Sequence, residues 1–240
     1  MTSKLDAKSI AKTLEKNGIK EAAKFQSAYM RNLFPHFGLK TPERRTLTKP
    51  LIGSSKDSVD WKFIEECWNF SQRDMQHVAL DYLKFHRKQL TKDDLGRLQK
   101  LAQEKSWWDT VDTLAGLVGS ILMKDSSSKK VILKWSGHEN FWVRRLAILS
   151  QLLLKDKTDE VLLEKVLIHQ FGEKEFNAPS KDGLGEGQNR AFFINKAVGW
   201  ALRQYAKTNP QWVRDFLKKN AGKLSQLSMR EATKHLEVTV

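Results

Sequence analysis

Apolar residues recur every three or four positions over most of this 240-residue chain. Two clear groups are Val78, Leu80, Tyr82 and Leu83, and Leu146, Leu149, Leu152 and Leu153. This spacing predicts amphipathic α-helices. No segment alternates apolar and polar residues convincingly, and the chain has no Asn-Gly hairpin signal. The pattern therefore predicts an all-α protein.

Helix-start signals divide the chain at several places. Thr41 precedes Pro42, and Asn209 precedes Pro210, which predicts two N-caps followed by a proline at the first helical position. In a capping box, a Ser or Thr stands three residues before an acidic residue. That spacing predicts three further starts, at Thr91–Asp94, Ser106–Asp109 and Ser228–Glu231.

One type of helix occurs several times along the chain. The segments MQHVALDYLKFH, VDTLAGLVGSIL, WVRRLAILSQLL and INKAVGWALRQY share a pattern, with alanines at positions 79, 115, 147 and 197. MREATKHL adds Ala232. Periods in this range are typical of stacked helix pairs, and a small alanine lets neighbouring helices approach closely. We therefore predict an α-solenoid in a single domain, 1–240, whose concave face binds a partner. The alternative is an ordinary helical domain whose helices merely share a pattern.

The longest step between these alanines contains the segment 172–190, which has four glycines and one proline. We predict a long inserted loop there. Its GLGEG stretch has neither the lysine nor the preceding strand of a phosphate-binding loop.

The charge of the chain points to an anionic partner. Lys and Arg number 42 against 28 Asp and Glu, which gives a formal net charge of +14. Such an excess favours nucleic acid or an anionic membrane surface. The basic residues are spread over the folded body and form no tail, which favours nucleic acid over a membrane. A merely basic protein without such a partner remains the alternative.

The residue inventory excludes several classes of site. The single cysteine, Cys67, excludes an intrachain disulfide and a cysteine-based zinc site. The six histidines show no metal-ligand spacing, so we expect no metal and no cofactor. No stretch reaches the roughly 20 apolar residues of a membrane span, and no secretory signal begins the sequence. We expect a cytoplasmic protein.

The segment SWWDTVDTLAG, 106–116, sets two tryptophans beside two aspartates. The capping-box spacing explains Asp109, but Asp112 has no such local duty. On a helix, Trp108 and Asp112 are four residues apart and share a face, while Trp107 points elsewhere and can pack inward. One interpretation is an exposed aromatic plane beside a carboxylate. The alternative is that Asp112 pairs with a lysine of the next repeat and Trp108 belongs to the core.

Five blocks in order give the chain a resemblance to the AlkD family of alkylpurine DNA glycosylases. They are AYMRNLF with GLKTPERR, KSWWDTVD, FWVRRLAIL, FFINKAVGWALRQYAKTNP and LSMREATKHL, and together they cover roughly residues 10–235. The resemblance implies a solenoid of about six HEAT-like repeats with a basic concave face that grips duplex DNA. It also implies hydrolysis of the N-glycosidic bond of N3- and N7-alkylated purines, with the lesion remaining largely in the base stack and no lyase activity.

The resemblance also implies roles for individual residues. Asp112 matches the catalytic aspartate, and Trp108 and Trp200 match two aromatic residues that contact the deoxyribose of the lesion. Arg145 matches an arginine that holds the DNA backbone. The other residues expected at the DNA are Tyr29, Lys40, Arg45, Arg144, Phe192 and Phe193.

This chemistry is consistent with the residue types. An alkylated purine is already cationic and leaves without protonation, so no strong general acid is needed. The sugar becomes positively charged as the bond breaks, and a carboxylate beside it stabilises that charge or orients water. Aromatic faces attract cations.

Two features depart from the family pattern. Lys40 stands where an uncharged glutamine is expected, and the 172–190 segment is longer than the expected connection. They motivate a second hypothesis, a HEAT-like paralogue that binds damaged or branched DNA without catalysis. A third is a helical scaffold for an acidic protein. We expect a monomer that associates with the bacterial nucleoid when bound to DNA.

Overall fold

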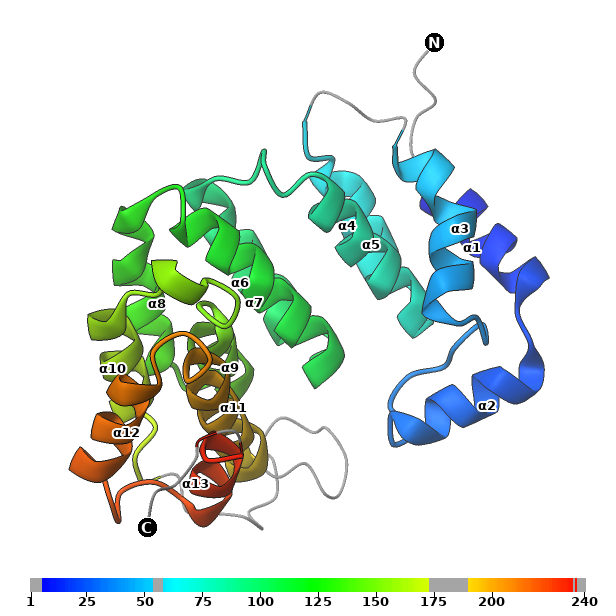
Figure 1. The fold of residues 1–240 in the computed structure, drawn as a ribbon. Coiled ribbons are helices and arrows are strands. Elements are labelled where there is room, and N and C mark those ends of the chain that lie inside the picture. The colour runs from blue at the N-terminus through cyan, green and yellow to red at the C-terminus, as the bar shows by residue number, and fades with distance from the viewer. Residues whose placement is uncertain (1–5, 54–57, 173–189, 235, 237–240) are drawn as a thin grey trace. The chain divides into compact units, whose positions relative to one another are not determined.

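The structure is a computed structural model that describes residues 6–53, 58–172, 190–234 and 236. Within these ranges the chain forms thirteen α-helices and three short 3-10 helices, with no strand (Figure 1). The all-α prediction is confirmed. No helix in the described ranges is both long and apolar enough to cross a membrane.

The chain divides into two compact units, residues 1–90 and 91–240. The prediction of one domain over 1–240 therefore stays a prediction, and each unit is described by itself. Of the expected 172–190 loop, residues 173–189 lie outside the described residues.

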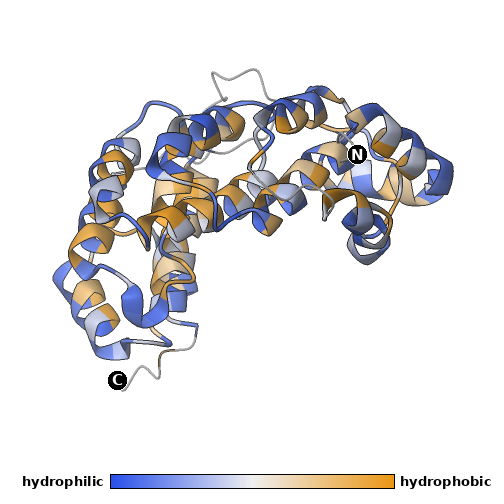
Figure 2. Cartoon of the chain, turned by 90° about the horizontal axis from the view of Figure 1, so that it is seen from above, coloured by the Kyte–Doolittle hydropathy of each residue, from blue (hydrophilic) through white to orange (hydrophobic). Residues whose placement is uncertain are grey.

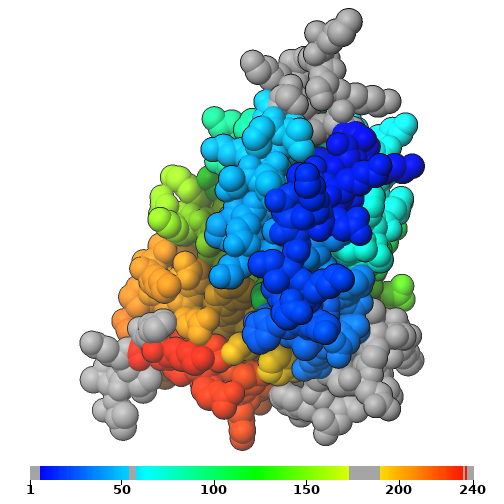
Figure 3. Space-filling view, turned by 90° about the vertical axis from the view of Figure 1, so that its right-hand side faces the viewer, coloured from blue at the N-terminus to red at the C-terminus, as the bar shows by residue number. Residues whose placement is uncertain are grey.

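Unit 1 contains five helices, whose contacts centre on α4 and α5. They are α1 (Ala7–Asn17), α2 (Lys20–Tyr29), α3 (Thr41–Ile52), α4 (Trp61–Asn69) and α5 (Arg73–Phe85). α4 and α3 both pack on α5, and α1 packs on α3 and α4. α2 contributes no buried residue and lies on the surface of this unit (Figure 3).

Unit 2 is built as two layers of helices. One layer consists of α7 (Trp108–Leu122), α9 (Phe141–Leu149), α11 (Arg190–Tyr205) and α13 (Gln226–Ala232). Each helix of this layer contacts the next. The other layer consists of α6 (Leu95–Gln103), α8 (Lys129–Ser136), α10 (Glu160–Ile168) and α12 (Pro210–Lys219). This alternation is the stacking of helix pairs expected for a solenoid. Four of the five segments with the recurring alanine are the helices of the first layer, and the fifth, with Ala79, is α5 of unit 1.

The recurring alanines lie where helices meet. Ala79, Ala115, Ala147, Ala197 and Ala232 are all buried. Helices of both units carry apolar positions on one side and polar positions on the other (Figure 2). The core of each unit therefore follows the three-and-four spacing of the sequence. Leu153 is an exception, because α9 ends at Leu149 and the Leu153 side chain is exposed.

Two of the five predicted helix starts are confirmed. The Asn209 side chain accepts a hydrogen bond from the Trp212 amide at 3.1 Å, directly before Pro210. The Thr91 amide donates to Asp94 Oδ2 at 2.8 Å, as a capping box requires. A third start is displaced by one residue, because the N-cap of α3 is Lys40 and not Thr41.

The other two capping-box predictions are wrong. Ser106 Oγ donates to the Ala102 carbonyl at the end of α6, at 2.7 Å, and the N-cap of α7 is Trp107. At the C-terminal end, Ser225 caps α13 by accepting a hydrogen bond from the Ser228 amide. Ser106 instead bonds back to the preceding helix, and Ser228 Oγ donates to the Asn195 carbonyl of α11, so neither side chain caps its own helix.

Candidate active site

The start of α7 separates its two tryptophans. Trp107 has an extended backbone as the N-cap, and its side chain is buried. The ring centroid of Trp107 lies 5.9 Å from that of Trp142 and 5.2 Å from that of Phe193. Trp108 begins the helix and stays partly exposed. The sequence-based prediction that Trp107 packs inward is confirmed, and Trp108 is not part of the fully buried core.

Asp112 lies one turn after Trp108 and forms a two-pronged ion pair with Arg145 of α9. Arg145 Nε donates to Asp112 Oδ1 at 2.7 Å, and Arg145 Nη2 donates to Asp112 Oδ2 at 2.8 Å. Arg145 Nη1 donates to the carbonyl of Phe193 on α11 at 2.6 Å. Three helices thus fix one carboxylate. The alternative, a lysine partner from the next repeat, is wrong about the residue type: the partner does come from a later helix, but it is Arg145.

The pair is asymmetric in its access to solvent. The Asp112 side chain is 16% exposed, whereas that of Arg145 is 4% exposed. Each carboxylate oxygen has two acceptor positions and uses one of them on Arg145. The remaining lone pairs of Asp112 can therefore serve a water molecule or a developing positive charge at the surface.

Burial sets the ionisation of this carboxyl group. Desolvation raises the pKa of Asp112, the Arg145 guanidinium offsets part of that rise, and the negative charge of Asp109 adds to it. A carboxylate with a raised pKa is more basic and less solvated than a surface aspartate. Both properties suit a group that stabilises a cation or accepts a proton from water.

An aromatic cluster packs beside the Asp112–Arg145 ion pair, with the Phe193 ring centroid 5.8 Å from the Arg145 guanidinium carbon. Phe193 is buried. Its ring stacks on Phe141 with centroids 6.3 Å apart and meets Trp142 at a tilt with centroids 4.9 Å apart. Phe192 meets Phe193 edge-on at 5.4 Å and keeps 39% of its surface exposed. Only Phe192 of the expected aromatic pair can therefore reach a ligand at the surface. Trp200, further along α11, is partly exposed.

The remaining residues expected in unit 2 are two arginines. Arg144 is partly exposed, while Arg145 is turned inward on Asp112 and Phe193. In this conformation Arg145 positions the carboxylate. Its expected contact with the DNA backbone, and that of Arg144, stay predictions.

In unit 1 the structure places the expected DNA-contacting residues on the surface. The side chains of Tyr29 and Lys40 are exposed. Gln26 Nε2, one turn before Tyr29, donates to the Leu39 carbonyl at 2.9 Å, so α2 is tied to the residue before Lys40.

Arg45 is held by a carboxylate of the neighbouring helix. Its side chain is 52% exposed, and its Nη2 lies 3.0 Å from Asp81 Oδ1, while the buried Arg44 contacts the other oxygen of Asp81. Burial alone would raise the pKa of Asp81, but the hydrogen bonds from Arg45 and Arg44 outweigh it and lower that pKa. Asp81 therefore stays ionised and fixes both arginines.

Sequence reasoning missed two groups of residues. It did not pair Asp112 with Arg145, and it overlooked a cluster of cations around Glu231 of α13. The signal for the second was the spacing of Lys196, Trp200 and Arg203, which share a face of a helix. No group of three metal-ligating side chains occurs in the described part of the chain.

Comparisons with known proteins identify the family of the chain. The family model described as DNA alkylation repair enzyme matches residues 10–236. A solved structure described as a predicted DNA alkylation repair enzyme from Enterococcus faecalis is 34% identical, with a TM-score of 0.79. The match covers 92% of this chain and 97% of that one. No curated protein sequence gives a significant match. The chain belongs to the DNA alkylation repair enzyme family, which assigns it a role in alkylation repair with DNA as its partner.

Proposed function

We propose that the chain is a monofunctional DNA glycosylase. It hydrolyses the N-glycosidic bond of cationic N3- and N7-alkylated purines in duplex DNA. The observation that carries this proposal is the Asp112 carboxylate, which Arg145 fixes through both oxygens while it keeps access to solvent. Family membership supports the repair role, and the carboxylate supplies the chemistry.

The reaction needs little from the protein beyond electrostatics and position. The alkylated base carries a positive charge and leaves as a neutral purine, taking the bonding electrons of the C–N bond. The positive charge then develops on the sugar, where the Asp112 carboxylate stabilises it and orients or deprotonates the attacking water. Because Arg145 holds Asp112 in place beforehand, little reorganisation is needed during bond cleavage.

Aromatic side chains complete the proposed site. Trp108 lies on the same face of α7 as Asp112, and Trp200 and Phe192 are the partly exposed aromatic residues of α11. Aromatic faces attract the positive charge of the base and sugar. Contact through the sugar and backbone leaves the lesion in the stack, so no closed pocket for an extruded base is required.

The first test is excision of 7-methylguanine and 3-methyladenine from methylated duplex DNA. Asp112→Asn removes the charge and keeps the size, and we expect the single-turnover rate to fall on the order of 10²-fold or more. Asp109→Asn, three residues earlier on α7, is the matched control and should excise at nearly the wild-type rate. Thermal unfolding of both variants checks that each is folded.

Two outcomes would contradict the proposal in different ways. Undiminished excision by a folded Asp112→Asn variant would remove Asp112 from the chemistry. Tight DNA binding by the wild type with no release of any cationic alkylpurine would select the hypothesis of a binding protein without catalysis.

A further inference from the structure

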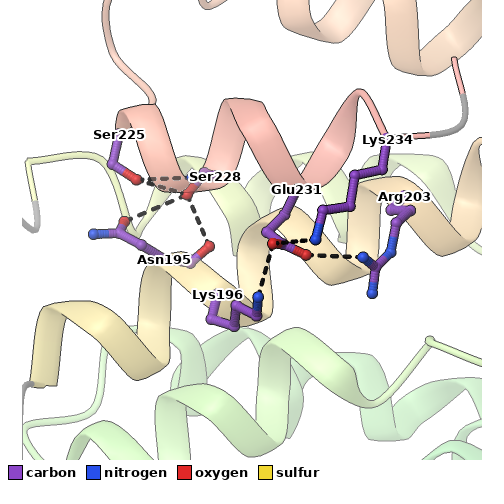
Figure 4. Close-up of polar contacts among 7 residues, drawn as sticks. All are labelled: Asn195, Lys196, Arg203, Ser225, Ser228, Glu231 and Lys234. Atoms are coloured by element: carbon purple, nitrogen blue, oxygen red, sulfur yellow. Dashed lines mark hydrogen bonds and ion pairs between the residues drawn. The ribbon is translucent and has the colours of Figure 1, made fainter.

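A buried carboxylate organises three cations where α11 and α13 meet. Glu231 of α13 is 2% exposed, and its Oε1 accepts hydrogen bonds from Lys196 Nζ at 2.7 Å and Lys234 Nζ at 2.6 Å. Its Oε2 accepts one from Arg203 Nη1 at 2.8 Å. Figure 4 shows the three cationic side chains converging on this single carboxylate.

The cluster keeps an excess of positive charge at the surface. Lys196, Arg203 and Lys234 are 38%, 23% and 44% exposed. Among the described residues, Glu231 is the only acidic partner of these three cations, so one negative charge faces three positive ones. Burial opposes ionisation of Glu231, but the hydrogen bonds from Lys196 and Lys234 dominate and lower its pKa to about 2. The cluster therefore has a net charge of about +2 at neutral pH.

Its position links it to the candidate active site. Phe192, Lys196, Trp200 and Arg203 follow one another at intervals of four, four and three along α11. Positions at such intervals lie on one face of a helix. None of the four is buried, whereas most other residues of α11 are. Lys196 and Arg203 therefore flank Trp200 on the exposed face of α11.

The contact between the helices holds the cluster in place. Ser228 Oγ of α13 donates to the Asn195 carbonyl at 2.9 Å (Figure 4). Gly199 allows the close approach, because a Cβ there would lie 2.5 Å from Glu231 Cβ and 2.8 Å from the Ser228 carbonyl oxygen. Cations fixed in this way lose less conformational entropy on binding a ligand than free surface lysines do.

We propose that Lys196, Arg203 and Lys234 form a binding site for a phosphate of the DNA backbone, and that Glu231 is the positioning residue that assembles it. An ammonium group has three N–H donors and a guanidinium has five, so each cation retains donors beyond the one given to Glu231. Hydrogen bonds from such cationic donors to phosphate oxygens are roughly twice as strong as bonds between neutral groups. The inference rests on the proposed binding of duplex DNA, but it does not depend on excision.

The test is the salt dependence of binding to an undamaged duplex oligonucleotide. Each phosphate contact that is lost lowers the slope of log affinity against log salt by roughly 1. We expect Lys196→Gln/Lys234→Gln to lower the slope by at least that amount and to weaken low-salt binding about tenfold. Arg203 still pairs with Glu231 in this variant, which preserves the contact of α13. Lys196→Arg/Lys234→Arg keeps both charges and should restore the wild-type slope.

A matched control removes the same charge from the other layer of unit 2. Lys134 of α8 and Lys165 of α10 are exposed, so Lys134→Gln/Lys165→Gln should leave the slope close to that of the wild type. If thermal unfolding shows that Lys196→Gln/Lys234→Gln is unfolded, the single variant Lys234→Gln replaces it, because Lys234 is exposed and lies just after α13. Equal slopes for the folded cluster variant and the control would overturn the inference.

The same experiment separates this inference from the proposed function. A wild-type protein that binds DNA but releases no base contradicts the glycosylase proposal and leaves the phosphate site standing. A cluster variant with an unchanged slope and normal excision contradicts the phosphate site alone. A wild-type protein with no affinity for DNA at low salt contradicts both.

Discussion

At the scale of single residues, the two aspartates of SWWDTVD differ in what surrounds them. Asp109 lies in the first turn of α7, where a negative charge favours the helix N-terminus. Asp112 is bound by Arg145 and keeps a small exposed area. From the sequence, Asp109 was explained as the acidic residue of a predicted capping box. Asp112 had no such explanation and was therefore the candidate for chemistry. In the structure, what distinguishes Asp112 is its ion pair with Arg145, which lies 33 residues away on α9.

The raised pKa of Asp112 predicts an acid limit for excision. Only the ionised carboxylate stabilises a cationic sugar, so the single-turnover rate should fall on acidification at a pH above the ordinary aspartate value of 3.8. A raised pKa means that Asp112 contributes most stability below its unfolded pKa and loses that contribution as the pH rises through its folded pKa. Titration of Asp112 therefore cannot itself unfold the protein on acidification.

The measurement is the excision rate against pH, with circular dichroism at each pH to confirm folding. Carboxyl groups with lowered pKa values, such as Asp81 and Glu231, lose their stabilising contribution only as the pH falls below their ordinary range. A rate that stays constant down to the ordinary aspartate pKa would show that burial does not control the reacting carboxyl group. The profile of Lys134→Gln should match that of the wild type.

At the scale of helices, the repeat explains which side chains meet. Contacts between successive helix pairs join residues about one period apart, such as Asp112 with Arg145 and Trp135 with Gln99. Lys196 and Glu231 follow the same rule at 35 residues. The recurring alanines already revealed this period in the sequence. Side chains that pair across neighbouring helices of a layer could therefore have been predicted from this period. The two capping boxes could not be judged from spacing alone, because Ser106 bonds to α6 and Ser228 bonds to α11.

Substitution of two glycines of α7 tests how closely α7 approaches the end of α9. A Cβ at Gly119 would lie 2.3 Å from the Ser150 carbonyl oxygen at the end of α9, whereas a Cβ at Gly116 would meet nothing within 4 Å. We expect Gly116→Ala to stabilise the protein by about 0.5–1 kcal/mol, because alanine favours the helix. Gly119→Ala should instead destabilise it by about 1–3 kcal/mol through overpacking. Urea denaturation of both variants measures the difference. Equal stabilisation by both substitutions would contradict the close contact of α7 with α9.

At the scale of the whole molecule, the positive charge is divided evenly. Unit 1 has 17 Lys and Arg against 10 Asp and Glu, and unit 2 has 25 against 18, so each unit carries a formal net charge of +7. In both units a carboxylate of one helix fixes cations at the surface, Asp81 in unit 1 and Glu231 in unit 2. The composition predicted an anionic partner. It could not predict the clusters around Asp81 and Glu231, because their members come from different helices that only the fold brings together.

This division predicts that both units contribute separately to DNA affinity. Lys40→Gln/Arg45→Gln in unit 1 should lower the salt slope for duplex binding by about 1 or more, and Lys12→Gln/Lys16→Gln, at exposed positions of α1, is the control with the same charge change. Combined with Lys196→Gln/Lys234→Gln, the losses should add, because sites without shared partners act independently. Fluorescence anisotropy titrations at several salt concentrations measure all the slopes. A slope that responds only to the variants of unit 2 would confine the phosphate contacts to that unit and would remove Lys40 and Arg45 from the DNA interface.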